Sequence, residues 1–159
     1  IFFKYFMKLG VLIYLEDKKE RILMIHREKN DEHKGLWLAP GGKVESNETP
    51  IETAIREMKE ETGLVIENPK MKAVLTFPDN GDSPFGDEWH VFVFYSKKYS
   101  GILTSDCPEG RLEWIPKREL NKLPTWEGDH IFNSKILEPG FFSAKFVYSG
   151  KKLIYHTIF

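Results

Sequence analysis

Three glutamates near the middle of the chain stand at a spacing that suits metal-ion chemistry. Glu57, Glu60 and Glu61 fall at i, i+3 and i+4, so that on a helix their side chains share one face. Like charges at this spacing destabilise a helix by about 0.2–0.5 kcal/mol per pair. A divalent cation such as Mg²⁺ makes the same arrangement favourable, because it takes oxygen ligands from carboxylates together with substrate phosphates. The alternative interpretation is a solvated surface helix rich in acidic residues.

The residues around these glutamates predict the helix that carries them. Asn47 or Thr49 can cap its N-terminus, and Pro50 falls in its first turn. Gly63 is expected to end the helix after about four turns. The guanidinium of Arg56 can reach a carboxylate with two parallel hydrogen bonds. A separate stripe of the helix is expected to pack against a sheet: Ile51, Ala54, Ile55, Met58 and Thr62.

The flanks of this helix complete a longer motif. Gly42 is followed after five residues by Glu48, and after a further seven residues by the run REMKEETGL from Arg56 to Leu64. Residues 42–64 thus resemble the full Nudix box with every fixed position present, and Pro40-Gly41 ahead of them also fits. The chain is identified as a member of the Nudix hydrolase family over essentially its whole length. The resemblance implies a metal-dependent hydrolase that cleaves the pyrophosphate linkage of a nucleoside diphosphate joined to another group.

The resemblance also implies roles for individual residues. Glu57 and Glu60 are expected to take part in catalysis, with Arg56 orienting Glu57. Glu48 is expected to stabilise these residues without contacting the substrate itself, and Lys43 is expected to bind a phosphate. Metal ions suit the reaction because they neutralise a polyphosphate, lower the pKa of a bound water and hold the reacting groups in line. The donors expected to bind Mg²⁺ or Mn²⁺ are Glu57, Glu60, Glu61 and the backbone carbonyl of Gly41.

The general base stays open between a glutamate of the box and one from a later loop. Glu109, in Pro108-Glu109-Gly110 and five residues before Trp114, resembles the loop acid that related enzymes use; the alternative is an ordinary loop acid. Glu113 suits the role less well, because it falls inside a predicted strand.

The second half of the chain resembles the MutT-like, 8-oxo-dGTP diphosphatase-like branch, which hydrolyses oxidised or ordinary nucleoside triphosphates. The segment 123–129, LPTWEGD, is similar to the one that supplies a purine pocket. Trp126 is then expected to stack on the base, with Glu127 and Asp129 reading its edge; the alternative for Trp126 is core packing. Two departures leave base selectivity open: Leu38-Ala39 stand where that branch often has an Asn, and Gly128 stands where a second acid is expected.

Other interpretations stay beside this one. Pro78, which lies 15 residues after Gly63 (78 − 63), falls near a proline of ADP-ribose-hydrolysing relatives, so an ADP-ribose or nucleotide-sugar pyrophosphatase is the alternative function. A non-catalytic, nucleotide-sensing module is a further alternative, although such modules usually lack one of the box glutamates. Cys107 is expected to be a bystander. Five histidines lack metal-ligand spacing and are expected to be solvated or packed: His26, His33, His90, His130 and His156.

Strands predominate among the elements that must position these residues. We predict strands at 8–15, 21–27, 36–39, 71–77, 89–97 and 111–115, with Pro40-Gly41-Gly42 breaking regular structure and 78–87 forming a loop. Residues 126–137 are predicted as a second helix after a short helical segment opened by Pro116, and 142–148 with 153–159 as a terminal hairpin. Many strands with only two substantial helices predict an α+β fold, a Nudix-like α/β/α sandwich around a mixed β-sheet.

Composition sets the outer limits of function. With 159 residues the chain is expected to form a single domain, 1–159, and 41% hydrophobic with 30% charged residues excludes a disordered or collagen-like chain. A net charge of −1 argues against a duplex nucleic-acid partner, which leaves a small nucleotide, and the oligomeric state stays unknown. One cysteine favours a reduced, cytoplasmic location. Residues 1–15 are expected to form a strand with extra upstream residues ahead of Met7, because charges interrupt them too often for a membrane span.

Overall fold

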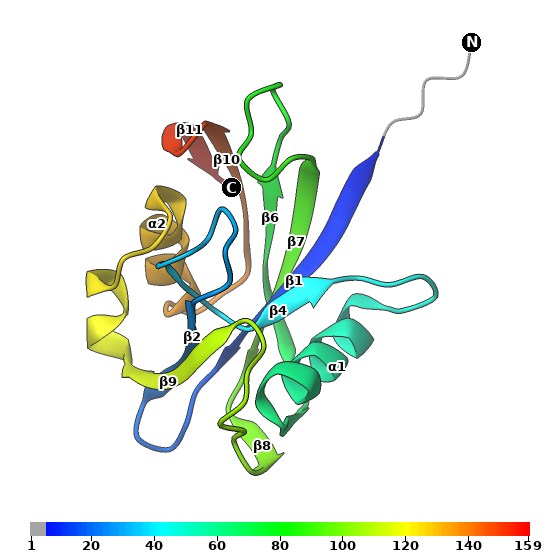
Figure 1. Ribbon diagram of the computed structural model, residues 1–159, viewed down its shortest axis with the longest axis vertical. Coiled ribbons are helices and arrows are strands. Elements are labelled where there is room, and N and C mark those ends of the chain that lie inside the picture. The colour runs from blue at the N-terminus through cyan, green and yellow to red at the C-terminus, as the bar shows by residue number, and fades with distance from the viewer. Residues whose placement is uncertain (1–5) are drawn as a thin grey trace.

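The structure, a computed structural model, describes residues 6–159, so the part of the predicted first strand that falls on residues 1–5 lies outside the described residues. Figure 1 shows the elements along the chain. The strands are β1 (Met7–Leu15), β2 (Arg21–Arg27), β3 (Trp37–Leu38), β4 (Gly41–Lys43), β5 (Leu64–Glu67), β6 (Lys70–Phe77), β7 (Glu88–Ser96), β8 (Lys98–Gly101), β9 (Gly110–Pro116), β10 (Phe142–Ser149) and β11 (Lys152–Ile158). The helices are α1 (Pro50–Thr62), a 3₁₀ segment η1 (Lys117–Lys122) and α2 (Glu127–Ile136).

A mixed six-stranded sheet forms the centre of the molecule, with strand order β11-β10-β6-β7-β1-β4. β1 runs parallel to β7, and β10 parallel to β6, while the other neighbours are antiparallel. A three-stranded sheet, β3-β2-β9, and a two-stranded sheet, β5-β8, complete the strands. Parallel neighbours require long crossover connections, and one of these connections carries the helix α1.

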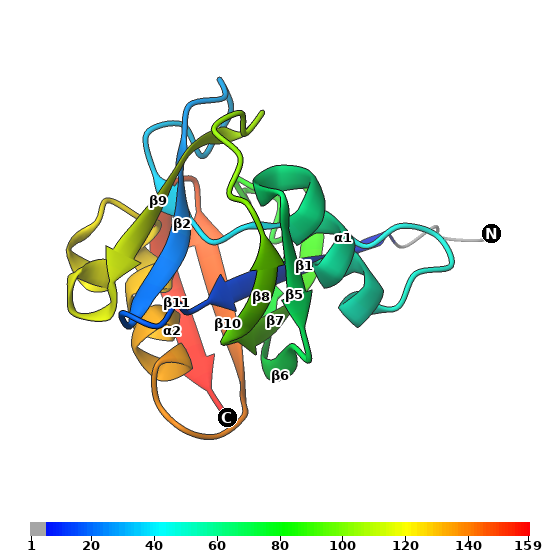
Figure 2. The ribbon, with the colours of Figure 1, turned by 90° about the horizontal axis from the view of Figure 1, so that it is seen from below.

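The central sheet is covered on both faces. Figures 1 and 2 show α1 with β5 and β8 on one side of β1, and α2 with β2 and β9 on the other. Successive side chains of a strand point to opposite faces, so Val11, Ile13 and Leu15 of β1 join one buried cluster, with Met58 of α1. Tyr14 joins the other cluster, with members from β2, α2 and β10. The expected α/β/α sandwich around a mixed sheet is confirmed.

The helix α1 begins as one of the two predicted caps requires. Thr49 is the N-cap and forms a capping box with Glu52, which satisfies two backbone N–H groups at once. Asn47 is not the cap; it has a φ of 68° in the preceding turn. Gly63 ends the helix in the left-handed conformation, with a φ of 80°.

The predicted buried stripe of α1 is partly wrong. Ile51 and Ile55 are 41% and 37% exposed, whereas the helix buries Thr53, Ala54, Met58, Glu61 and Thr62. The face turned to the sheet includes polar groups because each finds a hydrogen-bond partner there. The Thr53 hydroxyl donates to Glu48 Oε1 at 3.0 Å, and Glu61 Oε2 accepts from the backbone N–H of Gly41 at 3.2 Å.

Two further expectations about strands are corrected. Gly41 and Gly42 do not break regular structure but pair with β1 as part of β4. A Cβ on Gly41 would lie 2.0 Å from the carbonyl oxygen of Val11, so the two strands can approach this closely only where the side chain is absent. The short pair β5 and β8 was not predicted, because Leu64–Glu67 and Lys98–Gly101 become strands only through pairing with each other.

Within residues 6–159, no helix has both the length and the apolar character needed to cross a membrane.

Candidate active site

The acidic face of α1 lies against the two glycines of β4. A Cβ on Gly42 would lie 2.3 Å from the carboxyl carbon of Glu57, and Gly41 donates its N–H to Glu61. These glycines therefore let two carboxylates of the helix lie directly against the backbone of the strand. Glu57 and Glu61 are largely buried, with 15% of the Glu57 side chain and 8% of Glu61 exposed. Glu60 lies outside this contact, with 58% of its side chain exposed.

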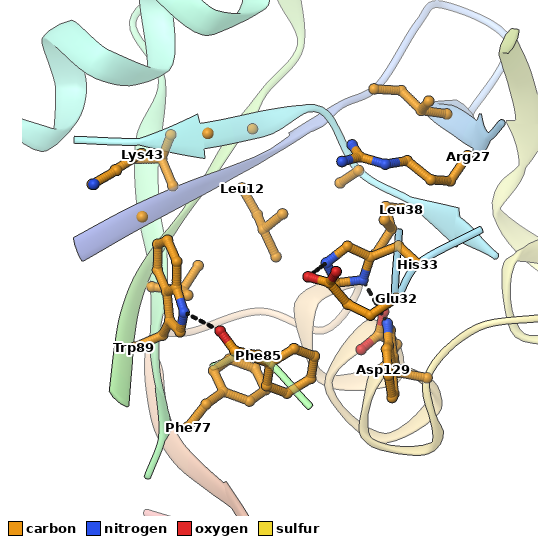
Figure 3. Close-up of a pocket in the computed structure, with 18 of the residues that line it drawn as sticks. Leu12, Arg27, Glu32, His33, Leu38, Lys43, Phe77, Phe85, Trp89 and Asp129 are labelled. Atoms are coloured by element: carbon orange, nitrogen blue, oxygen red, sulfur yellow. Dashed lines mark hydrogen bonds and ion pairs between the residues drawn. The ribbon is translucent and has the colours of Figure 1, made fainter. Parts of the chain in front are cut away.

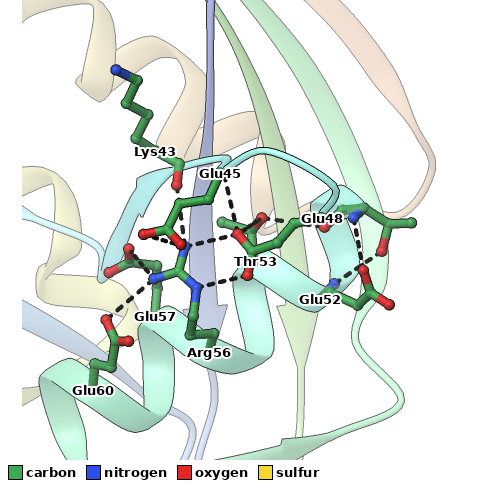
Figure 4. Close-up of polar contacts among 9 residues, drawn as sticks. Lys43, Glu45, Glu48, Glu52, Thr53, Arg56, Glu57 and Glu60 are labelled. Atoms are coloured by element: carbon green, nitrogen blue, oxygen red, sulfur yellow. Dashed lines mark hydrogen bonds and ion pairs between the residues drawn. The ribbon is translucent and has the colours of Figure 1, made fainter.

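Arg56 organises the carboxylates around it (Figure 4). Its Nε and Nη2 donate to the two carboxylate oxygens of Glu48, at 2.7 and 2.9 Å, in the bidentate arrangement that the sequence allowed. Its Nη1 donates to Glu57 at 2.8 Å and to Glu60 at 3.2 Å, and its Nη2 to the carbonyl of Lys43 at 3.3 Å. The hydrogen bonds from Arg56 lower the pKa of Glu48 to about 2. Arg56 thus connects the loop before the helix with two of the three glutamates.

The hydrogen bonds and positive charges around Glu57 and Glu61 do not compensate for the burial of their carboxyl groups. Burial, reinforced by the charges of Glu57 and Glu109, raises the pKa of Glu61 to about 8, although the Gly41 N–H and Arg27 act against it. Burial also raises the pKa of Glu57, despite its hydrogen bond from Arg56. A carboxylate with a raised pKa gains from a nearby cation.

The donors at this site fit a hard divalent cation by their chemistry. They are oxygens only, and two of them are buried carboxylates whose charge repels the other. Within residues 6–159, no three acidic, histidine or cysteine side chains already converge in a cation-binding arrangement. The carboxylates of Glu57 and Glu60 instead accept hydrogen bonds from Arg56, and therefore do not converge with Glu61 on one point.

Glu109 lies near the buried pair but is itself ion-paired. Its Oε2 lies 2.7 Å from Nη1 of Arg27 and 3.8 Å from Nζ of Lys29, and its charge contributes to the raised pKa of Glu61. The strand residue Glu113 instead has 51% of its side chain exposed and faces Arg111 at 3.8 Å. Of these two acids, the structure brings Glu109 to the site.

A cavity of about 330 Å³ reaches the acidic site at Glu61, and Figure 3 shows side chains that line it. Gly41, Gly42, Lys43 and Glu61 line one end, so the buried carboxyl of Glu61 forms a wall that the acidic site and the cavity share. Aromatic side chains also line the cavity: Phe77, Phe85, Trp126 and Phe132 line the other end, whereas Trp89 lies beside Gly10, which pairs with Lys43. An acidic end beside an aromatic end suits a ligand with both phosphates and a flat, apolar ring.

The residues predicted to bind substrate are only partly brought together. Lys43, Trp126 and Asp129 line the cavity. Trp126 is 5% exposed, and it contacts Phe85 and Tyr148 edge-on. Asp129 is deeply buried, and burial raises the pKa of its carboxyl well above the usual range. Burial thus favours the protonated form of this carboxyl.

The prediction that Glu127 binds substrate is corrected, because Glu127 is not among the described residues that line the cavity. It lies two positions before Asp129 on α2, roughly 200° around the helix, and its Oε1 accepts from the N–H of Leu153 at 3.3 Å. The absence of a second acid at Gly128 also has a steric reason. A Cβ there would lie 2.8 Å from the hydroxyl of Tyr148, which already accepts from the Gly128 N–H at 2.7 Å.

Sequence reasoning missed several residues of the cavity wall, among them Arg27, Glu32, His33, Phe85 and Trp89. His33 was expected to be solvated or packed rather than a metal ligand, and it is packed against Trp126 and Phe85, although the sequence did not place it at the cavity. These side chains come from three separate parts of the chain, so neither spacing nor periodicity could indicate that they meet. The proline-containing, glycine-rich character of residues 78–87 predicted a loop, but not that Phe85 turns inward.

Comparison with known proteins identifies relatives over most of the chain. A family model described as NUDIX domain matches residues 7–134. The chain is 34% identical over 131 residues to the uncharacterized Nudix hydrolase YvcI of Bacillus subtilis, covering 82% of this chain and 80% of that protein. It is 38% identical over 117 residues to an ADP-ribose pyrophosphatase of Methanocaldococcus jannaschii, covering 72% of this chain and 63% of the relative. The crystal structure of a mutator MutT protein from Bacillus halodurans superposes with a TM-score of 0.83 at 28% identity, covering 95% of this chain and 97% of the other.

Proposed function

This chain belongs to the Nudix hydrolase family, enzymes that act on pyrophosphate bonds, and on that premise we propose that it hydrolyses a purine nucleoside triphosphate to the monophosphate and pyrophosphate. The observation that carries the proposal is the shared wall of the acidic site and the aromatic cavity. Phosphates at the acidic end and a base at the aromatic end place the scissile linkage beside Glu57 and Glu61. The resemblance to a MutT structure along nearly the whole chain supports the same substrate class.

The acidic face of α1 has the proposed metal-binding role. Glu57, Glu60, Glu61 and the carbonyl of Gly41 would hold Mg²⁺ or Mn²⁺, which when bound would neutralise phosphate oxygens and activate the attacking water. Arg56 orients Glu57 and Glu60 through its hydrogen bonds. Glu48 fixes Arg56 in turn from the loop before the helix. Lys43, at the mouth of the cavity, supplies a positive charge to a phosphate.

For the general base we propose Glu57 rather than Glu109. A base must lie within reach of the attacking water, and Glu57 lies on the face of α1 that is proposed to hold the metal and the phosphates. Glu109 is paired with both Arg27 and Lys29, whereas Glu57 lies against the strand β4 with Arg56 as its cationic partner. Replacing Glu109 by Gln is then expected to lower turnover far less than the same change at Glu57.

The base of the nucleotide is proposed to meet Asp129 and the aromatic wall. A protonated carboxyl offers both an O–H donor and a carbonyl acceptor, which matches the donor and acceptor groups on a purine edge. Asp129 lines the cavity, and burial favours this form of its carboxyl. Trp126 and Phe85 supply the apolar surface around the ring.

A substrate panel tests the proposal directly. The purified protein is incubated with dGTP, 8-oxo-dGTP, ATP, CTP and ADP-ribose in Mg²⁺ or Mn²⁺, and the products are identified by mass spectrometry. We expect purine triphosphates to give monophosphate and pyrophosphate, EDTA to abolish the reaction, and excess Mg²⁺ to restore it, since ionised carboxylate ligands hold the metal. Absence of turnover on every nucleotide with either metal would contradict the proposed activity. Binding without turnover would instead support the non-catalytic alternative.

ADP-ribose is the second candidate substrate. The relative from Methanocaldococcus jannaschii is named an ADP-ribose pyrophosphatase and is 38% identical in the matched region. If ADP-ribose gives AMP and ribose 5-phosphate with a higher kcat/KM than any triphosphate, this candidate replaces the first. The choice of metal and the cytoplasmic location stay predictions from the sequence.

A further inference from the structure

His33 joins the aromatic wall of the cavity through Nδ1 and through the face of its ring. It lies in the loop between β2 and β3, while Trp126 precedes α2, 93 residues later in the chain. The indole Nε1 of Trp126 donates to Nδ1 of His33 at 2.8 Å. On the other side of the ring, Nε2 lies 3.2 Å from Oε1 of Glu32. The imidazole also stacks on Phe85, with the ring centroids 6.0 Å apart and an interplanar angle of 17°.

These contacts define the protonation state of His33. An indole N–H can only donate, so Nδ1 must be the acceptor, and the ring proton of the neutral imidazole lies on Nε2, facing Glu32. A protonated imidazole carries hydrogens on both nitrogens and accepts no hydrogen bond. Two N–H groups would then face each other across 2.8 Å, and the buried indole of Trp126 would lose its partner.

We propose that His33 is a positioning residue of the nucleotide pocket: its neutral imidazole holds the Trp126 indole in the pocket wall, so the base binds tightly only while His33 is unprotonated. The inference rests on the proposed function, because it assigns the cavity to a nucleotide base. It adds to that function a residue that fixes the wall, and an acid limit on affinity that is independent of the metal site.

The charged surroundings of His33 set the sign of the pH effect. Burial lowers the pKa of His33 below its ordinary value of 6.5, and Arg27 of β2 acts in the same direction, whereas Glu32 and Asp31 raise it. From α2, Asp129 lines the same cavity and burial favours its uncharged form, while Phe85 from the 78–87 loop adds no charge. The pKa of His33 is lowered overall. The hydrogen bond from Trp126 to His33 is therefore intact at neutral pH and is lost as the pH falls below 6.5.

Two substitutions separate the hydrogen bond from the ring. In His33→Asn the amide oxygen can take the place of Nδ1 as acceptor without titrating between pH 5 and 8, whereas His33→Leu removes the acceptor. His156→Asn is the matched control, because His156 lies on β11 and is exposed. The probe is GMP, whose dissociation constant is measured by calorimetry with Mg²⁺ from pH 7.5 to pH 5.0. Comparing each variant with the wild-type chain at the same pH cancels the ionisation of the phosphate.

At pH 7.5 we expect His33→Asn to bind GMP as the wild type does and His33→Leu to bind about two- to tenfold more weakly, the range of one neutral hydrogen bond. As the pH falls toward 5.0, the wild type should lose affinity relative to His33→Asn by a similar factor, while His156→Asn should follow the wild type throughout. In a Trp126→Phe background, which lacks the indole donor, His33→Leu should have little further effect. Equal affinities of wild type, His33→Asn and His33→Leu at every pH would overturn the proposal.

A spectroscopic measurement keeps this test separate from the test of activity. In ¹⁵N spectra, the indole N–H signal of Trp126, identified by its loss in Trp126→Phe, should shift with a midpoint below pH 6.5 in the wild type and stay constant in His33→Asn. An indole signal that does not change with pH in the wild type rejects the role of His33 even if the enzyme is active. If the signal titrates but no nucleotide is bound or hydrolysed, the proposed function fails and the assignment of the wall to a nucleotide base fails with it.

Discussion

At the scale of single residues, the acidic site depends on how charge is shared around Arg56. Its guanidinium is bound by both oxygens of Glu48 and still donates to Glu57 and Glu60. One guanidinium therefore hydrogen-bonds three carboxylates and lies 3.7 Å from a fourth, that of Glu45, while the buried Glu61 has only the Gly41 N–H and the charge of Arg27 to favour its ionised form. Negative charge thus exceeds positive charge on this face of α1, and a bound cation would be stabilised most there.

Glu57→Gln tests this arrangement. The amide oxygen can still accept from Arg56, so we expect the midpoint of thermal unfolding to change little. Turnover in saturating Mg²⁺ should fall about 100-fold or more, because charge stabilisation by a held metal ion is worth several kcal/mol and about 1.4 kcal/mol is a factor of ten. Steady-state kinetics with thermal melting measures both effects. Glu113→Gln, an exposed acid on β9, is the matched control and should retain full activity. Near-normal turnover of Glu57→Gln would contradict the assigned role.

At the scale of elements, the contact between β4 and α1 brings backbone and carboxylates together. The two adjacent glycines of β4 meet different atoms. A Cβ on Gly41 would lie 2.0 Å from the backbone oxygen of Val11, whereas a Cβ on Gly42 would lie 2.3 Å from the end of the flexible Glu57 side chain. Backbone in a paired strand cannot move aside cheaply, but a carboxylate can rotate away.

The two alanine variants should therefore separate folding from function. We expect Gly41→Ala to lower the free energy of unfolding by about 1–3 kcal/mol or more, the usual cost of overpacking. Gly42→Ala should change it by about 1 kcal/mol or less and still lower kcat strongly, because it displaces Glu57. Chemical denaturation and kinetics on both proteins distinguish these effects. Equal losses of stability with unchanged kcat in Gly42→Ala would show that the contact has no part in catalysis.

At the scale of the whole molecule, Glu16 joins parts of the fold that are far apart in sequence. It follows β1 and is 3% exposed. It accepts a short hydrogen bond from Tyr95 of β7, and one from Lys117 of η1 at 3.1 Å, and Lys97 lies 3.6 Å away. Burial alone would raise the pKa of Glu16, but these hydrogen bonds and positive charges outweigh it and lower the pKa.

A lowered pKa in the folded state means that the ionised form stabilises the fold. Its contribution is complete above the unfolded value near 4.5 and is lost as the pH falls through the lower, folded value. We expect Glu16→Gln to lower the free energy of unfolding at pH 7 by about 1–3 kcal/mol, the range for charged hydrogen bonds. Urea titrations between pH 7 and pH 3 should show a smaller difference between the two proteins at the acid end. A difference that stays constant over this range would contradict the ionised role of Glu16.

The sequence by itself determined the features that depend on neighbouring residues. Helix α1 with its Gly63 end, the strands β1 and β2 and the terminal hairpin follow from local periodicity and turn chemistry, whereas the choice of Thr49 over Asn47 as the N-cap did not. The spacing of Glu57, Glu60 and Glu61 indicated one acidic helix face, because helix geometry repeats every few residues. The Nudix box was recognised for the same reason, since its fixed positions fall within one segment of 23 residues (42–64).

Tertiary structure decided which of these residues are buried and which meet. Only the docking of α1 on β4 buries Glu61 and leaves Glu60 and Ile55 exposed. Only the approach of the β2–β3 loop to α2 brings His33 to Trp126, and only pairing makes strands of β5 and β8. These contacts join residues separated by tens of positions, and they depend on how whole faces pack. No local pattern specifies that packing, because burial, hydrogen-bond satisfaction and steric fit are settled together when the elements assemble.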